Sequence, residues 1–205
     1  MPPVKQRTPA LKDRLLAEAV GLLAQEGPAG FTARSLAARA ETSAPAVYEL
    51  FGDKSGVVRE LYFEGFRMLA AALGAVEESP DPVADLRALA QAYRAFLLEH
   101  GRLAEVMFSR PFTDFSPGPD ELAATSSVRV LVVGRVRRCI QAGAFRGDET
   151  DLAHVFVALV QGMAFSESAG RLGTSGASIE RRWVLALDAL FAGFGAATTR
   201  PPRRP

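Results

Sequence analysis

The stretch FTARSLAARAETSAPAVYELFGDKSGVVRELY, residues 31–62, decides the fold of this chain. It predicts two short helices joined by a turn of about three or four residues, the second helix spanning 44–51. Ser43 can cap this second helix, and the small side chains of Ala37 and Ala40 allow the two helices to cross closely. Small residues at the crossing and polar ends facing outward are what a helix-turn-helix requires. The segment therefore predicts a helix-turn-helix unit.

Four side chains of this segment are suited to contact a nucleic-acid backbone. Tyr48 and Lys54 are expected to project outward toward phosphates. Thr32 and Ser43 stand at helix N-termini, where a hydroxyl and free backbone N–H groups can bind phosphate oxygens. A half-buried core tyrosine and a plain surface lysine are the alternatives for Tyr48 and Lys54. We expect all four to lie at a DNA backbone.

The rest of the chain is predicted to form further helices, separated by proline, glycine and capping residues. The β-branched run 128–133 would suit a strand, but the apolar positions that follow it fit a period of about 3.6 residues, which favours a helix. Residues 109–119 are too rich in proline and glycine for a regular element and are expected to form a loop. The predicted fold class is therefore all-α. The expected helices outside the first stretch cover residues 9–27, about 53–76, 82–101, 102–108, about 128–143, 150–171 and 178–195.

Composition excludes several classes of protein. A chain of 205 residues with 48% hydrophobic and 23% charged residues is neither disordered nor collagen-like. Its single cysteine, Cys139, excludes a disulfide scaffold and a cysteine-built zinc site. The only histidines are His100 and His154, and no Gly-x-Ser-x-Gly or Walker segment occurs, so we expect no enzyme, cofactor or metal site. The net charge of +1 indicates no particular partner.

No segment is apolar over the roughly 20 residues that a membrane span needs. The longest stretch without a formal charge, 152–166, is interrupted by His154 and Gln161. Residues 1–9 lack the apolar run of a secretion signal. We therefore expect a soluble, cytoplasmic protein without a membrane partner.

Residues 8–68 resemble the helix-turn-helix domain of the TetR family of bacterial transcriptional regulators. Glu41 stands where this family usually has glycine, so either it adopts an uncommon left-handed conformation or the turn differs. Leu50 stands where many members have histidine. Residues 160–172 look like a Trp-His-Gly subfamily of ligand domains, although Gln161 replaces the expected histidine. The residues that match the family motif are Thr32, Arg34, Leu36, Ala37, Ser43, Tyr48, Phe51 and Lys54.

The resemblance implies a homodimer whose two recognition helices enter successive major grooves of a palindromic double-stranded DNA operator. The recognition helix begins with Ala44-Pro45-Ala46, which offers no hydrogen bonds to base edges. Thymine methyl contacts and DNA shape are therefore expected to carry much of the reading. Arg34 is the expected guanine contact, and a surface salt bridge to Glu41 or Glu49 is its alternative.

Residues 1–7 are expected to form a basic arm. Lys5 and Arg7, followed by Lys12 and Arg14, can track the DNA backbone or enter a minor groove. A solubilising tail is the alternative.

By the same resemblance, residues 77–198 are expected to form a helical ligand-binding and dimerisation domain, and residues 199–205 a disordered tail. Large, adaptable side chains can line an apolar pocket for an unknown small-molecule effector, although each also suits a plain core. The last two helices carry more apolar surface than one core covers, which suggests self-association. The candidate pocket residues are Phe66, Phe96, Met107, Phe108, Phe112, Phe156 and Met163, with Tyr93, His100, Arg110, Asp114, Gln161 and Glu167 as polar candidates. The candidate dimer residues are Phe165, Trp183, Leu187, Leu190, Phe191 and Phe194.

The sequence thus predicts a dimeric, sequence-specific transcriptional regulator, in the first place a repressor that a small apolar ligand releases from its operator. Two other classes stay open. The apolar start of the recognition helix suits a structural DNA-binding protein that tolerates any sequence. The helical ligand domain suits a small-molecule carrier with a vestigial DNA-binding head.

Overall fold

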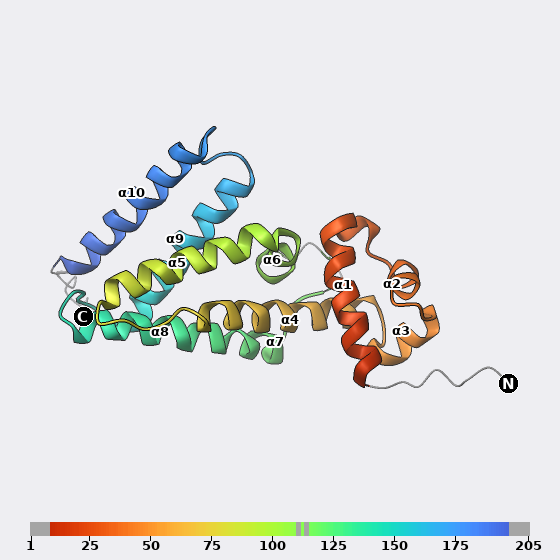
Figure 1. The fold of residues 1–205 in the computed structure, drawn as a ribbon. Helices are drawn as coiled ribbons and strands as arrows, with labels where there is room; N and C mark the ends of the chain where they lie inside the picture. The colour runs from red at the N-terminus through yellow and green to blue at the C-terminus, as the bar shows by residue number, and fades with distance from the viewer. Residues whose placement is uncertain (1–8, 110–111, 113–114, 197–205) are drawn as a thin grey trace, which may run out of the picture. The chain divides into compact units, whose positions relative to one another are not determined.

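The structure is a computed structural model that describes residues 9–109, 112 and 115–196. Every regular element in these residues is an α-helix (Figure 1), so the predicted all-α class is confirmed. None of these described helices is long and apolar enough to cross a membrane. The helices are α1 Pro9–Gly30, α2 Ala33–Arg39, α3 Ala44–Phe51, α4 Lys54–Gly74, α5 Pro82–Glu99, α6 Gly101–Phe108, α7 Pro119–Ala124, α8 Ser126–Gln141, α9 Glu149–Ser168 and α10 Gly176–Gly195.

The chain forms two compact units that interleave along the sequence. The first unit holds the residues up to Met68 together with His100–Thr125. The second holds Leu69–Glu99 and the residues from Ser126 onward. The sequential division into domains 8–68 and 77–198 that the sequence suggests stays a prediction. Helices α6 and α7 fall in the first unit because α6 packs on α1 and Glu121 of α7 pairs with Arg59 of α4.

In the first unit, α1 presents Leu15, Ala19 and Leu22 to the core at the helical spacing that the sequence predicts. Its regular path breaks at Gly27, which has a φ of 66° and a ψ of −173°. Helix α6 packs on α1, and it approaches α4 so closely that a Cβ on Gly65 would lie 2.6 Å from the Met107 sulfur. A side chain at this position would therefore force the two helices apart.

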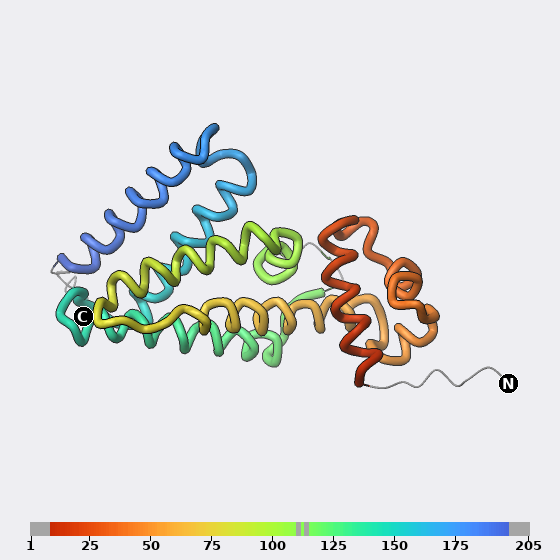
Figure 2. The backbone as a smooth tube through the Cα atoms, in the orientation of Figure 1, coloured from red at the N-terminus to blue at the C-terminus, as the bar shows by residue number. Residues whose placement is uncertain are grey.

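The second unit is built around α9, which contacts α5, α8 and α10 (Figure 2). Helix α10 lays Trp183, Leu187 and Phe191 into the core. The loop before α5 is fixed by Asp85, whose carboxylate accepts hydrogen bonds from the backbone N–H and the hydroxyl of Ser79 and from the Arg138 guanidinium. Cys139 is buried and donates to the Pro82 carbonyl oxygen at 3.2 Å, in keeping with a core role.

Helices α7 and α8 can be compared with the secondary structure that the sequence predicts for the middle of the chain. The β-branched run 128–133 is helical, as its longer-range period predicts, because it lies within α8. Helix α7 was not expected. It is a single short element, and the Glu121 carboxylate accepts a hydrogen bond from the Gly118 N–H at its start. A helix of this length carries too few residues to show a period.

Candidate nucleic-acid interface

Helices α2 and α3 begin at the two hydroxyl caps that the sequence predicts. The Thr32 hydroxyl oxygen accepts from the Ser35 N–H at 3.0 Å. The Ser43 hydroxyl oxygen accepts from the Ala46 N–H at 3.4 Å. Both caps are exposed. They hold the starts of α2 and α3 in place at the surface, and the Thr32 hydroxyl also shares a 2.8 Å hydrogen bond with the Ser35 hydroxyl.

The turn between these helices contains the residue that departs from the family pattern. Glu41 has a φ of 49°, so of the two alternatives the structure shows the left-handed conformation. The next residue, Thr42, donates its backbone N–H to the Ala37 carbonyl oxygen at 2.9 Å. Its buried hydroxyl has no hydrogen-bond partner among the described residues. The turn is thus formed at a local cost in backbone strain and in one unpaired polar group.

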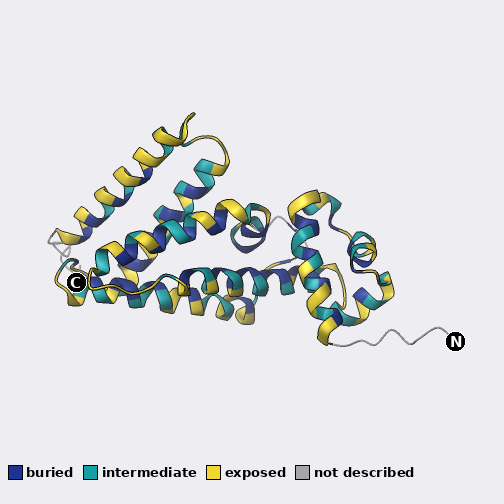
Figure 3. Cartoon of the chain, viewed as in Figure 1, coloured by how far each residue is buried: buried dark blue, intermediate teal, exposed yellow. Residues whose placement is uncertain are grey.

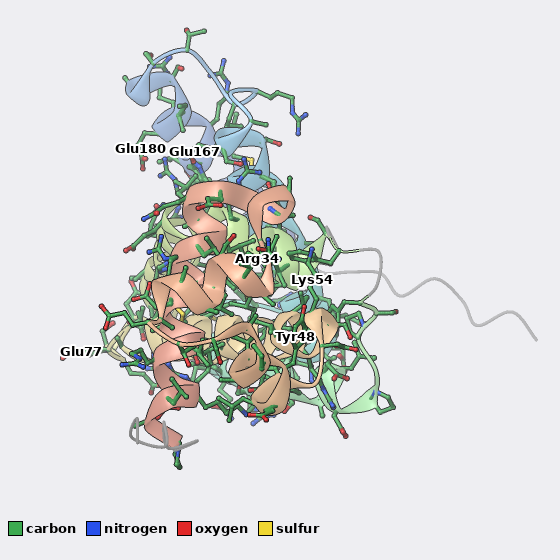
Figure 4. All side chains as sticks on the ribbon, turned by 90° about the vertical axis from the view of Figure 1, so that its right-hand side faces the viewer. Arg34, Tyr48, Lys54, Glu77, Glu167 and Glu180 are labelled. Carbon is green, nitrogen blue, oxygen red and sulfur yellow. The ribbon has the colours of Figure 1, made fainter. Side chains whose placement is uncertain are left out.

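Arg34, Tyr48 and Lys54 lie on the exposed side of the first unit. Tyr48 is 48% exposed, and Arg34 and Lys54 are exposed as well. Figure 4 shows the three residues in one part of the view, on α2, α3 and the start of α4. No described carboxylate forms a salt bridge with Arg34, although Glu41 and Glu49 were its expected alternatives. The three side chains are free to meet a duplex that approaches α3.

The first turn of α3 offers an apolar surface. Pro45 is exposed, and Ala44 and Ala46 are partly exposed, whereas Val47 is buried and anchors the helix. Methyl and ring carbons at these positions can contact thymine methyl groups but donate no hydrogen bonds. Any polar reading of base edges must therefore come from neighbouring side chains, of which Arg34 is the longest.

Lys5 and Arg7 of the expected basic arm lie outside the described residues. Lys12 is held inside the first unit rather than in an arm. Its ammonium lies 2.7 Å from a Glu60 carboxylate oxygen and 5.9 Å from the centre of the Phe51 ring. Lys12 thereby ties α1 to α3 and α4.

The candidate pocket residues divide between the two units. In the first unit the rings of Phe66 and Phe108 lie 5.5 Å apart, and Met107 packs against Gly65. Phe112 lies beside Phe31, at a ring distance of 5.8 Å. The second unit holds Phe96, Phe156 and Met163, of which Phe96 and Phe156 are buried in its core. Within either unit, then, only part of the predicted set comes together.

The polar candidates also separate. Gln161 donates to the Tyr93 hydroxyl oxygen at 2.8 Å inside the second unit, and burial raises the pKa of Tyr93 to about 12 despite this hydrogen bond. Glu167 is fully engaged, because it pairs with Arg94 at 2.8 Å and accepts from the Trp183 indole N–H at 2.7 Å. Burial opposes the ionisation of Glu167, yet these hydrogen bonds hold its pKa below the usual range. Arg110 and Asp114 lie outside the described residues, and His100 begins α6 in the first unit.

Most of the predicted dimer residues on α10 are not at the surface. Trp183, Leu187, Phe191 and Phe194 are buried in the second unit, so their surface is used within the chain itself. Phe165 and Leu190 are partly exposed. The outer side of α10, largely exposed in Figure 3, carries smaller apolar residues instead. The exposed apolar residues of α9 and α10, glycines included, are Val155, Ala158, Gly162, Gly176, Ala177, Val184, Leu185, Ala189, Ala192, Gly193 and Gly195.

Sequence reasoning missed two contacts beside Lys54. Its ammonium lies 5.1 Å from the centre of the Phe112 ring. Arg59, one turn further along α4, pairs with the buried carboxylate of Glu121 and lies 3.3 Å from Asp120. Both contacts join residues about 60 positions apart, and no local pattern signals such a pairing.

Two family models match the chain. The model described as "Bacterial regulatory proteins, tetR family" matches residues 15–61, which include α2, α3 and the motif residues. The model described as "Tetracyclin repressor-like, C-terminal domain" matches residues 86–190, half of the chain. No curated protein sequence matches. The resemblance of residues 160–172 to the Trp-His-Gly subfamily stays a prediction.

Solved structures agree with the family models. A protein of unknown function from Rhodococcus sp. RHA1 is 28% identical, and the match covers 96% of this chain and 100% of that one at a TM-score of 0.79. PfmR from Thermus thermophilus, a TetR family transcriptional regulator, is 23% identical, with 86% and 98% covered and a TM-score of 0.65. A TetR variant from Acinetobacter baumannii AYE, solved in complex with minocycline, is 21% identical, with 89% and 95% covered and a TM-score of 0.62. At these identities the last two likenesses show the fold alone. With both family models matched and the helix-turn-helix residues exposed together, the chain belongs to the TetR family of bacterial regulatory proteins and is a DNA-binding transcriptional regulator, not an enzyme.

Proposed function

We propose that this regulator is a homodimeric repressor in the cytoplasm that binds a palindromic operator and leaves it when a small apolar molecule binds the second unit. The observation that carries the proposal is the exposure of Arg34 on α2, Tyr48 on α3 and Lys54 at the start of α4 (Figure 4). An aromatic hydroxyl, an ammonium and a guanidinium exposed on these neighbouring helices are suited to contact phosphates on both sides of a major groove.

Different roles follow for these side chains. Tyr48 and Lys54 contact phosphates, so they add affinity for every sequence. Arg34 donates two hydrogen bonds to a guanine edge, so it adds preference for one base pair. The apolar Ala44-Pro45-Ala46 turn packs against thymine methyl groups.

The dimer forms through the exposed sides of α9 and α10. Small residues at Ala158, Gly162, Ala189 and Ala192 would let two copies approach closely, while Leu185 supplies a large apolar contact. A two-fold interface of this kind places the helix-turn-helix units of the two protomers, called the reading heads below, on one face of a duplex.

The effector binds near the hydrogen-bonded pair of Tyr93 and Gln161 in the second unit. This neutral pair joins α5 to α9, and Tyr93 is buried, so a ligand oxygen or nitrogen could replace one partner of the hydrogen bond. Helix α4 carries residues of both units, so a shift of α4 on effector binding would change the spacing of the reading heads. A coupling of about 1–3 kcal/mol would lower operator affinity roughly 5- to 150-fold.

The DNA part of the proposal is tested by fluorescence anisotropy with promoter DNA from beside the coding region and with random duplex at equal salt. Lys54→Met and Tyr48→Phe should weaken binding to both DNAs alike. Arg34→Ala should cost about 1–3 kcal/mol on the promoter and remove preference at a single base pair. Equal weakening on both DNAs by Arg34→Ala would remove its base-reading role.

The effector part is tested with a panel of apolar small molecules and the fluorescence of Trp183, the only tryptophan. Trp183 belongs to the second unit, donates to Glu167 and stacks under Arg94 at 4.9 Å, so its emission reports on that unit. A true effector should change the emission and release promoter DNA, and Gln161→Leu should weaken both effects together. Release of DNA without a change in the second unit would move the effector site elsewhere.

The apolar start of α3 favours one second candidate, a DNA-binding protein with little sequence preference. The same anisotropy experiment separates the two, because such a protein would bind promoter and random duplex equally at moderate salt.

A further inference from the structure

A ring from the distant segment after α6 lies against the lysine at the start of α4. The Lys54 ammonium lies 5.1 Å from the centre of the Phe112 ring, within the roughly 6 Å over which an ammonium is attracted to an aromatic face. Lys54 itself is exposed, whereas Phe112 is only 8% exposed. The lysine thus rests on a buried ring while its outer side faces solvent.

The ring of Phe112 is held in a fixed place. It packs edge-on against Phe31, with ring centres 5.8 Å apart and an angle of 65° between the planes. Phe31 is buried and directly precedes Thr32, the residue that caps α2. One ring therefore touches the start of α2 and the start of α4, the two helix ends that flank the DNA-facing surface.

Phe115 and Glu121 contact α4 as well. The Phe115 ring lies 5.8 Å from the Tyr62 ring, and the Phe115 N–H donates to the Phe112 carbonyl oxygen at 3.3 Å. Further on, the Glu121 carboxylate pairs with Arg59 on α4, with only 7% of the Glu121 side chain exposed. These contacts tie Phe115 and Glu121 to α4, whereas the Phe112 ring under Lys54 is held by its own contact with Phe31.

We propose that Phe112 is a positioning residue for DNA binding: its ring holds the Lys54 ammonium at the surface so that the side chain is already in place when a phosphate arrives. The proposal rests on the proposed DNA-binding role of Lys54. An ammonium has three N–H donors, and contact with a ring on one side leaves donors for a phosphate oxygen on the other. A free lysine loses more rotamer freedom on binding than one that is already held.

The expected loss is set by the cost of ordering one long side chain. Ordering a lysine on binding costs about 0.5–1.5 kcal/mol, which corresponds to roughly 2- to 10-fold in affinity. The effect is independent of base sequence because a phosphate contact carries no sequence information. A random-sequence duplex is therefore a sufficient probe, and no operator needs to be known.

The experiment measures the affinity of the full chain for a random-sequence duplex at several salt concentrations. Phe112→Leu keeps an apolar side chain but removes the aromatic face, and should weaken binding about 2- to 10-fold. Phe112→Tyr keeps the face and should bind like the parent. Phe115→Leu is the matched control, because this ring lies in the same segment and packs on Tyr62 instead of a lysine. It should leave the affinity unchanged.

Lys54 links the effect to its cause. Lys54→Met should lower the slope of log affinity against log salt by about 0.9, as expected for one lost phosphate contact. The double variant Phe112→Leu with Lys54→Met should bind no more weakly than Lys54→Met alone. Circular dichroism at the assay temperature shows whether each variant is folded. Comparing the DNA affinities of Phe112→Tyr and Phe112→Leu isolates the effect of the aromatic face.

Three results would overturn the proposal. Equal losses in the presence and absence of Lys54 would show that Phe112 acts on the fold and not on the lysine. Tighter binding by Phe112→Leu would show that the ring withholds the ammonium from DNA. A Lys54→Met variant that binds like the parent would remove the contact that Phe112 is said to position, while the proposed DNA-binding function would stand. Failure of the parent itself to bind any duplex would instead overturn the proposed function.

Discussion

Glu41 adopts a φ of 49° in the turn between α2 and α3, a conformation that suits glycine. A left-handed conformation costs a residue with a Cβ roughly 1–2 kcal/mol. Glycine avoids this steric cost but loses more backbone entropy on folding, so the net gain in stability is smaller. We expect Glu41→Gly to raise the free energy of unfolding by about 1 kcal/mol, measured by urea denaturation. Glu41→Ala removes the same charge but keeps the Cβ. An equal gain from Glu41→Ala would assign the effect to charge instead of backbone strain.

Thr42 buries a hydroxyl without a hydrogen-bond partner among the described residues. Valine has nearly the same shape and needs no partner, and an unpaired buried polar group costs about 1–3 kcal/mol. Thr42→Val should therefore stabilise the protein by about 1 kcal/mol in thermal or urea unfolding. Thr42→Ser keeps the hydroxyl and loses a methyl group, so it should give no gain. A destabilised Thr42→Val variant would show that the hydroxyl is bonded in solution.

The two turn residues differ in how far sequence could predict them. Glu41 stands out at once, because a family pattern expects glycine there, and only two backbone outcomes were open. The unpaired hydroxyl of Thr42 gives no sequence signal, since its environment depends on how α2 and α3 cross. Sequence can therefore predict an unusual backbone conformation at a single residue, but it cannot predict whether a particular side-chain atom is buried.

At the scale of helices, the start of α5 depends on one ionised carboxylate. Hydrogen bonds from the hydroxyl and N–H of Ser79, together with Arg138, lower the pKa of Asp85 to about 2 although burial opposes this. The unfolded chain has the ordinary value of about 3.9, so the unfolded state binds the proton more readily. The stabilisation by Asp85 is therefore complete above about pH 4 and is lost as the pH falls toward 2.

This dependence can be measured by urea unfolding between pH 6 and pH 2.5. Asp85→Asn should be less stable than the parent at pH 6, and the difference should shrink as the pH falls through the acidic window. Ser79→Ala removes one hydrogen-bond donor to Asp85, so the pKa of Asp85 in the folded protein should rise. The stabilisation should then be lost at a higher pH than in the parent. A difference between parent and Asp85→Asn that stays constant with pH would mean that Asp85 acts by packing alone.

Most helices could be predicted from sequence because their signals are local. Ser43 marks a helix start that the structure confirms. The helices expected from about 53 and from 82 also begin at local caps, because Asp53 accepts from the Gly56 N–H at 2.8 Å and Asp81 from the Ala84 N–H at 3.0 Å. The partition of the helices between units was not predictable in this way. It depends on contacts such as Glu121 with Arg59, which join distant positions.

Helix α10 illustrates the same limit for the candidate dimer site. Its period correctly predicts an apolar stripe, but the stripe with Trp183 faces the chain's own core. Periodicity identifies the side of a helix that seeks burial and cannot tell an internal partner from a second copy. The exposed side mixes small residues such as Ala189 and Ala192 with Val184 and Leu185, and this mixture forms no continuous apolar stripe.

For the whole molecule, the proposed dimer depends on apolar surface that the single chain leaves exposed. Leu185 on α10 and Val130 on α8 are each 68% exposed aliphatic residues of the second unit. Because neither contributes to the core, a glutamate at either position should leave the fold of the single chain intact. Only Leu185, however, lies on the surface with Ala158, Gly162 and Ala189 that we assign to the partner copy.

Leu185→Glu should therefore reduce the particle mass from twice 21.9 kDa to 21.9 kDa in light scattering. Near a two-fold axis the new carboxylate of one protomer would be buried beside the same carboxylate of its partner, and the two like charges would repel. Val130→Glu should remain a dimer. Since each reading head alone grips only half of the site, the Leu185 variant should also lose its preference for a palindromic promoter fragment over a single half-site, whereas Val130→Glu should keep it. A dimer that survives Leu185→Glu and dissociates with Val130→Glu would place the two-fold axis at α8, and the spacing of the two α3 helices would then be set by a different pair of surfaces.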